Sequence, residues 1–360
     1  MKYIVFFVAV ISLLVFNCTD ISPNQFLIAG FLTFLIPIAI VLNLIFFVWL
    51  FFKKSYFCIV PLIILVFGFK FVAGTFAINF PGDELGANTF SVLSYNTTFF
   101  KRSDFKDDPN PQTDPESDSY KMVKWIQDNG ADIKCFQEYY HRDSIDMFNT
   151  LDLIAESGEY DYYFSSKHMG QKNGEVGIAI FSRFPIVNSG EVIFKQGSVN
   201  RAAFADITIH GDTIRFINVH LQSMSLSPYN PLASKSLSDT KQNLRTVYEK
   251  FAKGLLDRSF QAEVIKELIY QSPYKVILVG DFNQTPYSFV YNSFKEIMHN
   301  AFEKAGSGFG FTYGGSTLFF LRIDNQFYDP GLKALDFQTH RDVPYSDHYP
   351  IEGKYGLGHD

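Results

Sequence analysis

The sequence is organised around one stretch, Lys275-Val276-Ile277-Leu278-Val279-Gly280-Asp281-Phe282-Asn283-Gln284-Thr285-Pro286. Its β-branched and aliphatic run is typical of a strand buried on both faces. The run ends at Gly280, where the missing Cβ lets the backbone turn, so that Asp281 and Asn283 can point into a crevice beyond the strand. A strand followed by a simple Asx turn is the structural alternative, and other parts of the chain must decide between the two.

Charge is distributed very unevenly along the 360 residues. Residues 1–79 hold four lysines and one acid, namely Lys2, Lys53, Lys54, Lys70 and Asp20. The whole chain has 31 Lys and Arg and 37 Asp and Glu, so the remainder carries 27 bases and 36 acids, a formal charge of −9. Such an acidic part does not favour sequence-independent adhesion to phosphate backbones, but it allows a bound cation. It contains a single cysteine, Cys135, which excludes an internal disulfide there.

Three apolar stretches near the N-terminus predict transmembrane helices. Residues 26–52 carry no charge, and at about 1.5 Å per residue they exceed a hydrocarbon core of about 30 Å. Residues 56–74 form another span, and residues 3–17 form a shorter one for which a signal-like segment is the alternative. The expected organisation is a membrane anchor over 1–79, a linker over 80–87 and a catalytic domain over 88–360.

Lysines predict the orientation of these spans. Lys2 and the pair Lys53-Lys54 should both lie on the cytoplasmic side, and three spans satisfy both at once. We therefore expect a multi-pass protein of the inner or plasma membrane whose C-terminal domain lies outside the cytoplasm.

Polar side chains follow several of the predicted strands. Asn96, Glu138 and His220 each end an apolar run, as Asp281 does, and Asp324 and the pair Asp347-His348 follow in late loops. Any one of them alone would be an ordinary turn former or solvated strand end. Strands that end in convergent polar groups usually place them in one crevice, so the joint arrangement predicts a site.

The residue types in this set suit phosphate-ester hydrolysis. That reaction needs neutralisation of the non-bridging oxygens, an activated water and stabilisation of the leaving oxygen. Glu138 and Asn96 offer oxygen ligands, and there is no paired Cys or His spacing of the kind that binds zinc. Mg²⁺ is the expected ion, with Mn²⁺ as the alternative.

Seven short motifs, taken together, resemble the endonuclease/exonuclease/phosphatase superfamily. They are Tyr95-Asn96, Gln137-Glu138, Phe181-Ser182-Arg183-Phe184-Pro185, Asn218-Val219-His220, Gly280-Asp281-Phe282-Asn283, Arg322-Ile323-Asp324 and Ser346-Asp347-His348-Tyr349-Pro350. They stand in the order of that family, whose members include DNase-I-like nucleases, abasic-site endonucleases, inositol polyphosphate 5-phosphatases and neutral sphingomyelinases. The resemblance implies a four-layer α/β/β/α sandwich, here preceded by three transmembrane helices, as in membrane-anchored bacterial members.

The resemblance also implies a ligand set for the metal. Glu138 corresponds to the principal Mg²⁺ ligand, with Asn96 and Asp347 near the ion. The segment Asn325-Gln326-Phe327 departs from the family, which usually has a Tyr-Ile-type strand start after the acid, so the local backbone after Asp324 is the one place where the pattern differs.

The same resemblance assigns catalytic roles to five residues. Asp281 is similar to the residue that aligns the attacking water, and Asn283 to the amide that contacts the scissile phosphate. His348 is similar to the catalytic histidine, Asp324 to the carboxylate that orients it, and His220 to a second histidine on the phosphate.

The function expected from the sequence is a membrane-anchored, Mg²⁺-dependent phosphodiesterase or phosphatase. Its substrate could be nucleic acid, a lipid headgroup or a small phosphoester, and no protein partner is implied. The alternatives are an extracytoplasmic nuclease acting on DNA and a non-catalytic binding domain that keeps the same fold.

Overall fold

A computed structural model describes most of the chain. The described residues are 2–79, 88–105, 114–169, 174–195, 198–223, 237–315 and 321–358. The linker expected at 80–87 lies outside them.

Packing divides the chain into two compact units, which are described separately. The first comprises Met1–Thr75, Gln222–Val264 and Gln284–Glu296, and the second comprises Phe76–Leu221, Ile265–Asn283 and Ile297–Asp360. Each unit is defined by contacts between residues and is built from three separate segments of the chain. The functional division expected from composition, an anchor over 1–79 and a catalytic domain over 88–360, stays a prediction.

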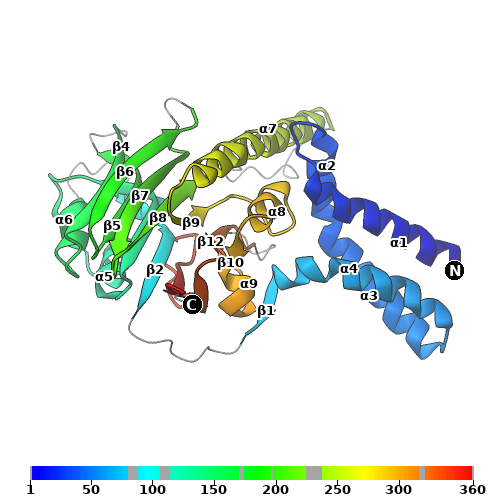
Figure 1. Ribbon diagram of the computed structural model, residues 1–360. Helices are drawn as coiled ribbons and strands as arrows, with labels where there is room; N and C mark the ends of the chain where they lie inside the picture. The colour runs from blue at the N-terminus through cyan, green and yellow to red at the C-terminus, as the bar shows by residue number, and fades with distance from the viewer. Residues whose placement is uncertain are drawn as a thin grey trace. The chain divides into compact units, whose positions relative to one another are not determined.

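The first unit is helical (Figure 1). Its N-terminal elements are α1 (Lys2–Asn17), η1 (Cys18–Asp20), α2 (Leu27–Leu32), η2 (Thr33–Leu35), α3 (Ile36–Phe52), η3 (Tyr56–Cys58) and α4 (Ile59–Ala73). It also holds α8 (Phe289–Lys295) and the larger part of α7 (Leu237–Tyr270).

The N-terminal helices pack through a few specific contacts. Asn43, buried within α3, donates to the Oγ of Ser12 on α1 at 2.8 Å and so links the two helices by a hydrogen bond inside an apolar bundle. The ring of Phe16 lies 5.2 Å from that of Phe71. Phe16 also lies against Gly68, where an added Cβ would come within 3.1 Å of the ring. The small residue lets α1 and α4 approach closely.

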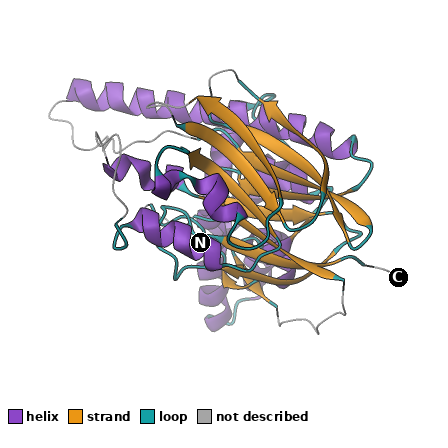
Figure 2. Cartoon of the chain, turned by 90° about the vertical axis from the view of Figure 1, so that its left-hand side faces the viewer, coloured by secondary structure: helices purple, strands orange, loops and turns teal. Residues whose placement is uncertain are grey.

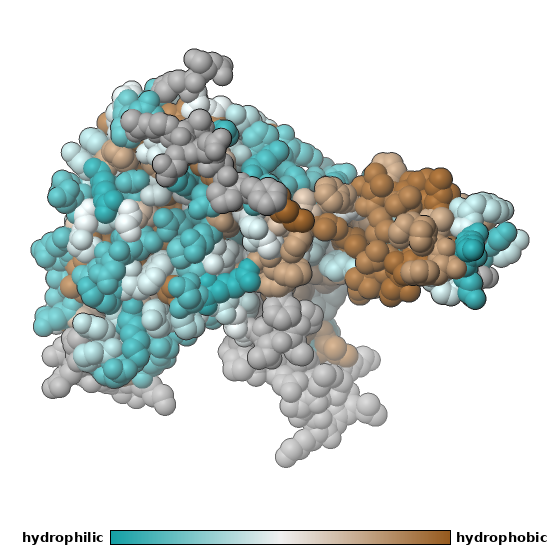
Figure 3. Space-filling view, turned by 90° about the horizontal axis from the view of Figure 1, so that it is seen from below, coloured by the Kyte–Doolittle hydropathy of each residue, from teal (hydrophilic) through white to brown (hydrophobic). Residues whose placement is uncertain are grey.

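Three apolar helices in this unit are long enough to cross a membrane. They are Lys2–Asp20, Leu27–Phe52 and Tyr56–Ala73, with mean hydropathies of 2.0, 2.7 and 2.3. Many of their large apolar side chains are exposed, which gives the continuous hydrophobic surface coloured brown in Figure 3. The three predicted apolar helices are thus present.

The second unit contains two six-stranded sheets (Figures 1 and 2). One sheet has the order β10 (His299–Asn300), β12 (Asp324–Tyr328), β9 (Lys275–Asp281), β8 (Asp212–His220), β7 (Arg201–Ile209) and β6 (Ile186–Ile193). The other has the order β13 (Lys333–Thr339), β14 (Ile351–Gly356), β2 (Thr89–Asn96), β3 (Ile133–His141), β5 (Glu175–Ser182) and β4 (Tyr162–Met169). A separate short pair joins β1 (Phe76–Ile78) to β11 (Ser307–Phe309).

The core of this unit lies between the two sheets. Alternate side chains of both inner faces form one buried cluster, which includes Phe90, Val92, Ile133 and Ile180 from one sheet and Ala205, Phe216, Ile277 and Val279 from the other. A second cluster covers the outer face of the β2–β3–β5 region with α5 (Asp118–Asp128) and α6 (Thr150–Ala155). The remaining short elements are η4 (Thr98–Phe105), η5 (Asp146–Phe148) and α9 (Ala301–Ala305).

Helix α5 shows how local sequence produces these elements. Ser117 accepts a hydrogen bond from the backbone N–H of Tyr120 and so caps the helix N-terminus. Met122, Val123 and Ile126 follow at helical spacing and are all buried against the sheet.

Three buried amide side chains connect the sheets across this core. Gln137 on β3 donates to the side-chain oxygen of Asn218 on β8 at 2.6 Å, and Asn218 donates in turn to the carbonyls of Phe136 and Ala179, each at 3.0 Å. Gln326 on β12 donates to the carbonyls of Val92 and Ile351 in the facing sheet. These directional bonds fix how the sheets are aligned, which the non-directional packing between them does not.

The predicted fold class, a four-layer α/β sandwich preceded by three apolar helices, is confirmed. The segment after Asp324, where the sequence departs from the family pattern, forms a regular strand, β12, paired with β9. Gln326 in that segment is one of the amides that bond across the two sheets.

Replacing Asn218 with alanine should destabilise the second unit strongly. The change removes the three hydrogen bonds that the buried Asn218 side chain makes with the Gln137 amide and with two backbone carbonyls. Their loss should lower the free energy of unfolding by roughly 3 kcal/mol. Thermal and denaturant unfolding of the purified chain measures the loss. The matched control is Asn188→Ala, because Asn188 is exposed and donates from its side chain to Asp206, so its loss should cost less than about 0.5 kcal/mol. Equal effects of the two substitutions would contradict the inter-sheet role.

Candidate active site

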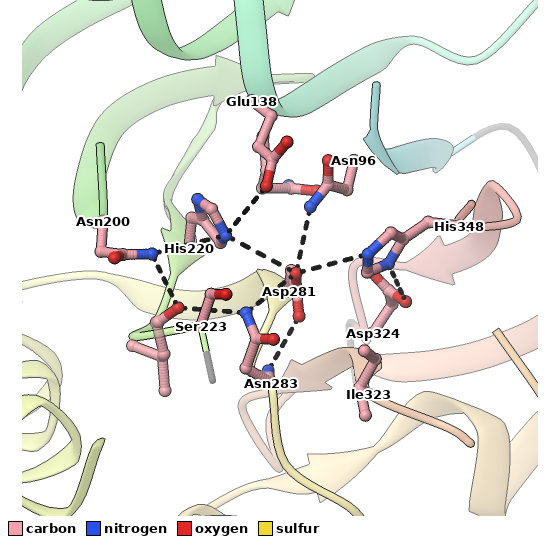
Figure 4. Close-up of polar contacts among 12 residues, drawn as sticks. Asn96, Glu138, Asn200, His220, Ser223, Asp281, Asn283, Ile323, Asp324 and His348 are labelled. Carbon is pink, nitrogen blue, oxygen red and sulfur yellow. Dashed lines mark hydrogen bonds and ion pairs between the residues drawn. The ribbon is translucent and has the colours of Figure 1, made fainter. Parts of the chain in front are cut away.

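Asp281 lies at the centre of a polar cluster in the second unit (Figure 4). It ends β9, and strand pairing places it directly beside His220 at the end of the parallel strand β8. On its other side it is paired with Asp324, the first residue of the antiparallel strand β12. The strand register therefore places the side chains of Asp281, His220 and Asp324 together at one end of the sheet.

Gly280 permits this arrangement. Its φ of +134° is a conformation that side chains rarely adopt, and an added Cβ would lie 2.0 Å from the carbonyl oxygen of Val219 on β8. Only glycine can lie so close to the neighbouring backbone. The glycine before the carboxylate is thus required both by its backbone angle and by the space available.

Amides hold the Asp281 carboxylate from two directions. Asn96, at the end of β2 in the facing sheet, donates to Oδ2 at 3.0 Å. Asn283 donates its side-chain N–H to Oδ2 at 3.1 Å and its backbone N–H to Oδ1 at 2.8 Å, using a positive φ of 50°. Burial raises the pKa of Asp281 above its usual value, and the nearby His348 and His220 oppose that rise.

His348 is held by a carboxylate on one side and faces Asp281 on the other. Its Nδ1 lies 2.9 Å from Oδ2 of Asp324, and its Nε2 lies 3.8 Å from Oδ2 of Asp281. Burial lowers the pKa of His348, but Asp324 and Asp281 outweigh burial and raise it to about 10. The imidazole is therefore protonated at neutral pH in the ion-free protein.

The backbone near His348 is fixed by neighbouring loops. The hydroxyl of Thr312 accepts hydrogen bonds from the backbone N–H groups of Ile323 and Asp324, each at 3.1 Å. The ring of Tyr313 lies 5.0 Å from the imidazole of His348. Both contacts limit the orientations open to the histidine and its carboxylate.

Glu138 reaches the cluster through an irregularity in β3. The pairing of β3 with β5 shifts register between Phe136 and Tyr139, and Glu138 has a φ of 47°. Such a bulge turns one side chain out of the regular alternation. Oε1 of Glu138 consequently lies 3.6 Å from Nε2 of His220. Burial, with Asp281 and Asp347 adding to it, raises the pKa of Glu138 to about 7 against an opposing effect of His348.

His220 completes the inner wall of the cluster. Its Nε2 lies 3.7 Å from Oδ2 of Asp281 and 3.5 Å from the side-chain nitrogen of Asn200. Burial lowers its pKa, so the ring is mainly neutral, in contrast to His348. Among the described residues its Nδ1 has no hydrogen-bond partner.

Asp347 belongs to the rim of the same cluster. Its carboxylate accepts a hydrogen bond from the hydroxyl of Thr98, and Ser346 beside it donates to the carbonyl of Asn96 at 2.8 Å. Burial raises the pKa of Asp347, but His348, the Thr98 hydrogen bond and Lys101 together hold it below the ordinary value.

The donor set fits a hard divalent cation. Four carboxylates, those of Glu138, Asp281, Asp324 and Asp347, share this small buried region with two histidines. Burial is the main cause that raises the pKa of Glu138, with Asp281 and Asp347 adding to it, so a cation bound beside this carboxylate would favour its ionised form. Oxygen donors of this kind suit Mg²⁺.

Geometry identifies a second group of potential ligands. Among the described residues, Asp281, Asp324 and His348 offer ligand atoms within 4.8 Å of one another. In this group Asp324 and His348 already bond each other, with Nδ1 of His348 2.9 Å from Oδ2 of Asp324. The side of Asp281 that faces Glu138 and Asn96 is the better place for a cation.

The structure brings all eight residues singled out from the sequence into this one cluster, but it also contains contributors that sequence reasoning missed. These are Asn200, Thr98, Ser346, Thr312 and Tyr313. Thr98 and Ser346 stand within two residues of Asn96 and Asp347, so proximity along the chain could have indicated them. Asn200, which donates to the carbonyl of Leu221 at 3.0 Å, precedes its strand and carries no comparable signal.

Solved structures share this fold. One is an endonuclease/exonuclease/phosphatase family protein from Bacteroides thetaiotaomicron, with 18% identity and a TM-score of 0.51 over 75% of this chain and 98% of that one. Another is a D. rerio TDP2 humanized by 14 mutations, with 15% identity and a TM-score of 0.52 over 75% of this chain and all of that one. At these identities the likeness shows the fold alone.

Sequence comparison adds the family. Among curated proteins no sequence matches the chain. Residues 2–75 match a domain of unknown function, DUF8431. The profile of the Endonuclease/Exonuclease/phosphatase family matches residues 93–348, a range that contains every residue of the polar cluster, and the chain therefore belongs to that family.

Proposed function

We propose that this protein is a membrane-anchored, Mg²⁺-dependent phosphoesterase that hydrolyses a phosphate ester by attack of water. Members of its family are generally hydrolases of phosphoesters and typically need a divalent metal. The observation that carries the proposal is the position of Asp281 between the Glu138 carboxylate and the protonated His348. Buried charged groups are costly to the folded state, and a non-catalytic binding domain would gain nothing from so many of them in one place.

Glu138, Asn96 and Asp347 are the residues that would hold the cation. Glu138 supplies a carboxylate whose negative charge the cation would balance. Asn96 supplies a side-chain carbonyl oxygen, which in the ion-free structure accepts a hydrogen bond from the backbone N–H of Thr98 at 3.1 Å. When bound, Mg²⁺ (or Mn²⁺) neutralises charge on the phosphate oxygens. The Thr98 hydrogen bond keeps Asp347 ionised and oriented.

Asp281 and Asn283 would act at the reacting atoms. A carboxylate oxygen of Asp281 accepts a hydrogen bond from the attacking water and so directs its lone pair at phosphorus. Asn283 bonds both Asp281 and the carbonyl of Leu221, which leaves its amide rigidly placed beside the phosphate. Attack forms the new P–O bond while the water gives one proton to the Asp281 carboxylate, the ester P–O bond breaks, and the leaving oxygen takes up a proton from solvent.

The two histidines would bind the phosphoryl group in different protonation states. His348, kept protonated by Asp324 and Asp281, donates from Nε2 to a non-bridging oxygen and offsets the charge that develops there. His220 is neutral and donates a hydrogen bond without adding charge. Asp324 holds His348 in one orientation and stabilises its charged form.

We also propose that the anchor places the catalytic domain, residues 88–360, outside the cytoplasm. Lys2 lies with its Nζ 4.9 Å from the ring centre of Phe57 and 5.5 Å from that of Tyr56. The first residue of α1 is therefore at the same end of the bundle as Lys53 and Lys54, and lysine-rich ends are retained in the cytoplasm. An odd number of crossings then takes the chain after residue 74 to the other side.

Substituting Glu138 by glutamine should weaken the binding of Mg²⁺ without abolishing it. The amide keeps one oxygen but loses its charge, so the Mg²⁺ concentration for half-maximal hydrolysis of bis-p-nitrophenyl phosphate should rise by about tenfold or more, with partial recovery at high Mg²⁺. EDTA should abolish activity in the unaltered protein. The matched control is Glu352→Gln, because Glu352 bonds His340 and Asn129 outside the cluster. Full activity in EDTA would contradict the ion assignment.

His348→Ala should lower kcat by roughly 10²–10⁴-fold with little change in KM. Asp324→Asn should cost less, since the amide still holds the imidazole but stabilises its charged form poorly. Steady-state kinetics on the same substrate measure both. His340→Ala removes another carboxylate-paired histidine, bonded to Glu352 at 3.1 Å, and should leave kcat nearly unchanged. Near-full activity of a folded His348→Ala variant would favour the binding-domain alternative.

A reporter fused to the C-terminus should behave as extracytoplasmic. Alkaline phosphatase, which needs an oxidising compartment, should be active there, and a reporter that is active only in the cytoplasm should be silent. The opposite pattern would refute the proposed orientation.

A further inference from the structure

A small aromatic patch stands on the second unit at β1 and β11. We call Phe76, Ile78, Phe309 and Phe311 the β1–β11 patch. Ile78 is 71% exposed and Phe309 is 51% exposed. The rings of Phe76 and Phe309 lie 4.9 Å apart, and those of Phe309 and Phe311 lie 5.2 Å apart and are stacked. Apolar rings that gather at the surface instead of in the core mark an interaction site.

The patch is rigidly attached to the rest of its unit. Asn79 donates to the carbonyls of Glu303 and Gly306, at 3.2 and 2.8 Å, which ties the end of β1 to α9. Arg341 donates to the carbonyl of Phe309, and its guanidinium carbon lies 5.9 Å from the ring centre of Phe311. An exposed cation therefore accompanies the apolar rings, a combination suited to the apolar and phosphate layers of a membrane surface.

The chain itself limits how far the patch can lie from a membrane. The third apolar helix ends at Ala73, and only Gly74 and Thr75 stand between it and Phe76 (Figure 1). Three residue steps span at most about 10 Å. The patch thus begins within the thickness of an interfacial layer from the end of the span, where aromatic residues are commonly enriched.

The patch is also close to the catalytic residues along a short, ordered segment. From Phe309 the chain runs through Thr312, whose carbonyl accepts from Tyr349, to Tyr313, whose ring contacts His348. Gly314 then donates its N–H to the carbonyl of Asp347 at 2.8 Å. Four residues from Phe309 to Tyr313 cover no more than about 14 Å. A substrate in the headgroup layer beside the patch would therefore be within a short distance of His348.

A separate feature of the first unit points to the same membrane face. Helix α7 lies against the start of the second apolar helix, where Tyr248 stacks on Phe31 at 5.2 Å and Phe251 packs edge-on to Phe34 at 6.0 Å. Leu244 on α7 remains 56% exposed. The start of the second span and the end of the third lie on the same side of any bilayer that these helices cross, whichever way the chain is oriented. Helix α7 therefore packs beside the apolar helices on the side of the bilayer where the third span ends.

We propose that the β1–β11 patch rests in the headgroup layer of the membrane and that the substrate of the polar cluster is a phosphoester in the headgroup of a membrane lipid. The substrate part of this inference rests on the proposed phosphoesterase function. The membrane contact does not rest on that function, because it follows from the exposed apolar side chains and the adjoining span alone.

The full chain reconstituted in phosphatidylcholine vesicles provides the test. Ile78→Asp puts a charge on the most exposed member of the patch, and loss of one buried large apolar side chain corresponds to about tenfold in binding. Hydrolysis of the vesicle phospholipid should fall by about tenfold, while hydrolysis of soluble bis-p-nitrophenyl phosphate should change less than twofold. Val187→Asp is the control, because Val187 on β6 is 58% exposed and outside the patch, and it should leave both rates unchanged.

A second measurement does not depend on activity. A tryptophan introduced by Phe309→Trp should be quenched by brominated phospholipids beyond the quenching of the parent, which contains Trp49 and Trp125, and Val187→Trp should add none. Equal quenching at the two positions would overturn the contact.

The possible outcomes separate the two proposals. Hydrolysis of the soluble ester together with DNA, but not of phospholipid, would overturn the lipid substrate and leave the phosphoesterase function standing. Hydrolysis of phospholipid that Ile78→Asp does not affect would overturn the role of the patch. No metal-dependent hydrolysis of any ester would overturn the proposed function, and quenching at Phe309 would then still support the membrane contact.

Discussion

The hydrogen bond between Gln137 and Asn218 is the interaction on which the polar cluster depends. It crosses the core between the two sheets, at a place where apolar side chains alone would let one sheet slide over the other. Gln137 stands immediately before Glu138, and Asn218 stands two residues before His220. Because one amide pair sets the alignment of β3 with β8, it also sets the distance between Glu138 and His220. Contacts between the two sheets in the interior of the sandwich therefore determine the geometry of the site.

The electrostatics of the cluster follow from that imposed closeness. Buried carboxylates repel one another and lose hydration, so some must bind a proton or a cation. The two histidines respond in opposite ways: His348 is charged because Asp324 and Asp281 flank it, and His220 is neutral because burial dominates. A pair of like residues with different protonation states gives one cluster both a cationic and a neutral hydrogen-bond donor. The raised pKa of Glu138 marks where a divalent cation would relieve the remaining negative charge.

Within the anchor, a hydrogen bond between two helices lowers the cost of placing polar side chains in an apolar bundle. Asn43 donates to Ser12 across the helices, so each of these two buried side chains has a hydrogen-bond partner in a largely apolar bundle. In the proposed function, the anchor keeps the polar cluster near a membrane surface, where the concentration of lipid headgroups greatly exceeds that of most dissolved phosphoesters. Along the chain, only Gly74 and Thr75 separate the end of α4 at Ala73 from the start of β1 at Phe76.

The order of apolar runs and polar strand ends in the sequence was enough to predict the three apolar helices and a convergence of polar residues, and the resemblance of its motifs to a known family implied the sandwich. It was enough because a buried strand has a continuous apolar signature, a membrane span has a length set by the bilayer, and a polar side chain at the end of a strand has few structural uses. Tertiary structure decided the rest. Asn200 and Tyr313 join the cluster only through the folding of distant loops, and the turn of Glu138 out of its strand depends on a bulge that no local pattern announces. The protonation of His348 was equally beyond the sequence, because a pKa depends on which carboxylates lie within a few ångströms, and only the stacked sheets determine that.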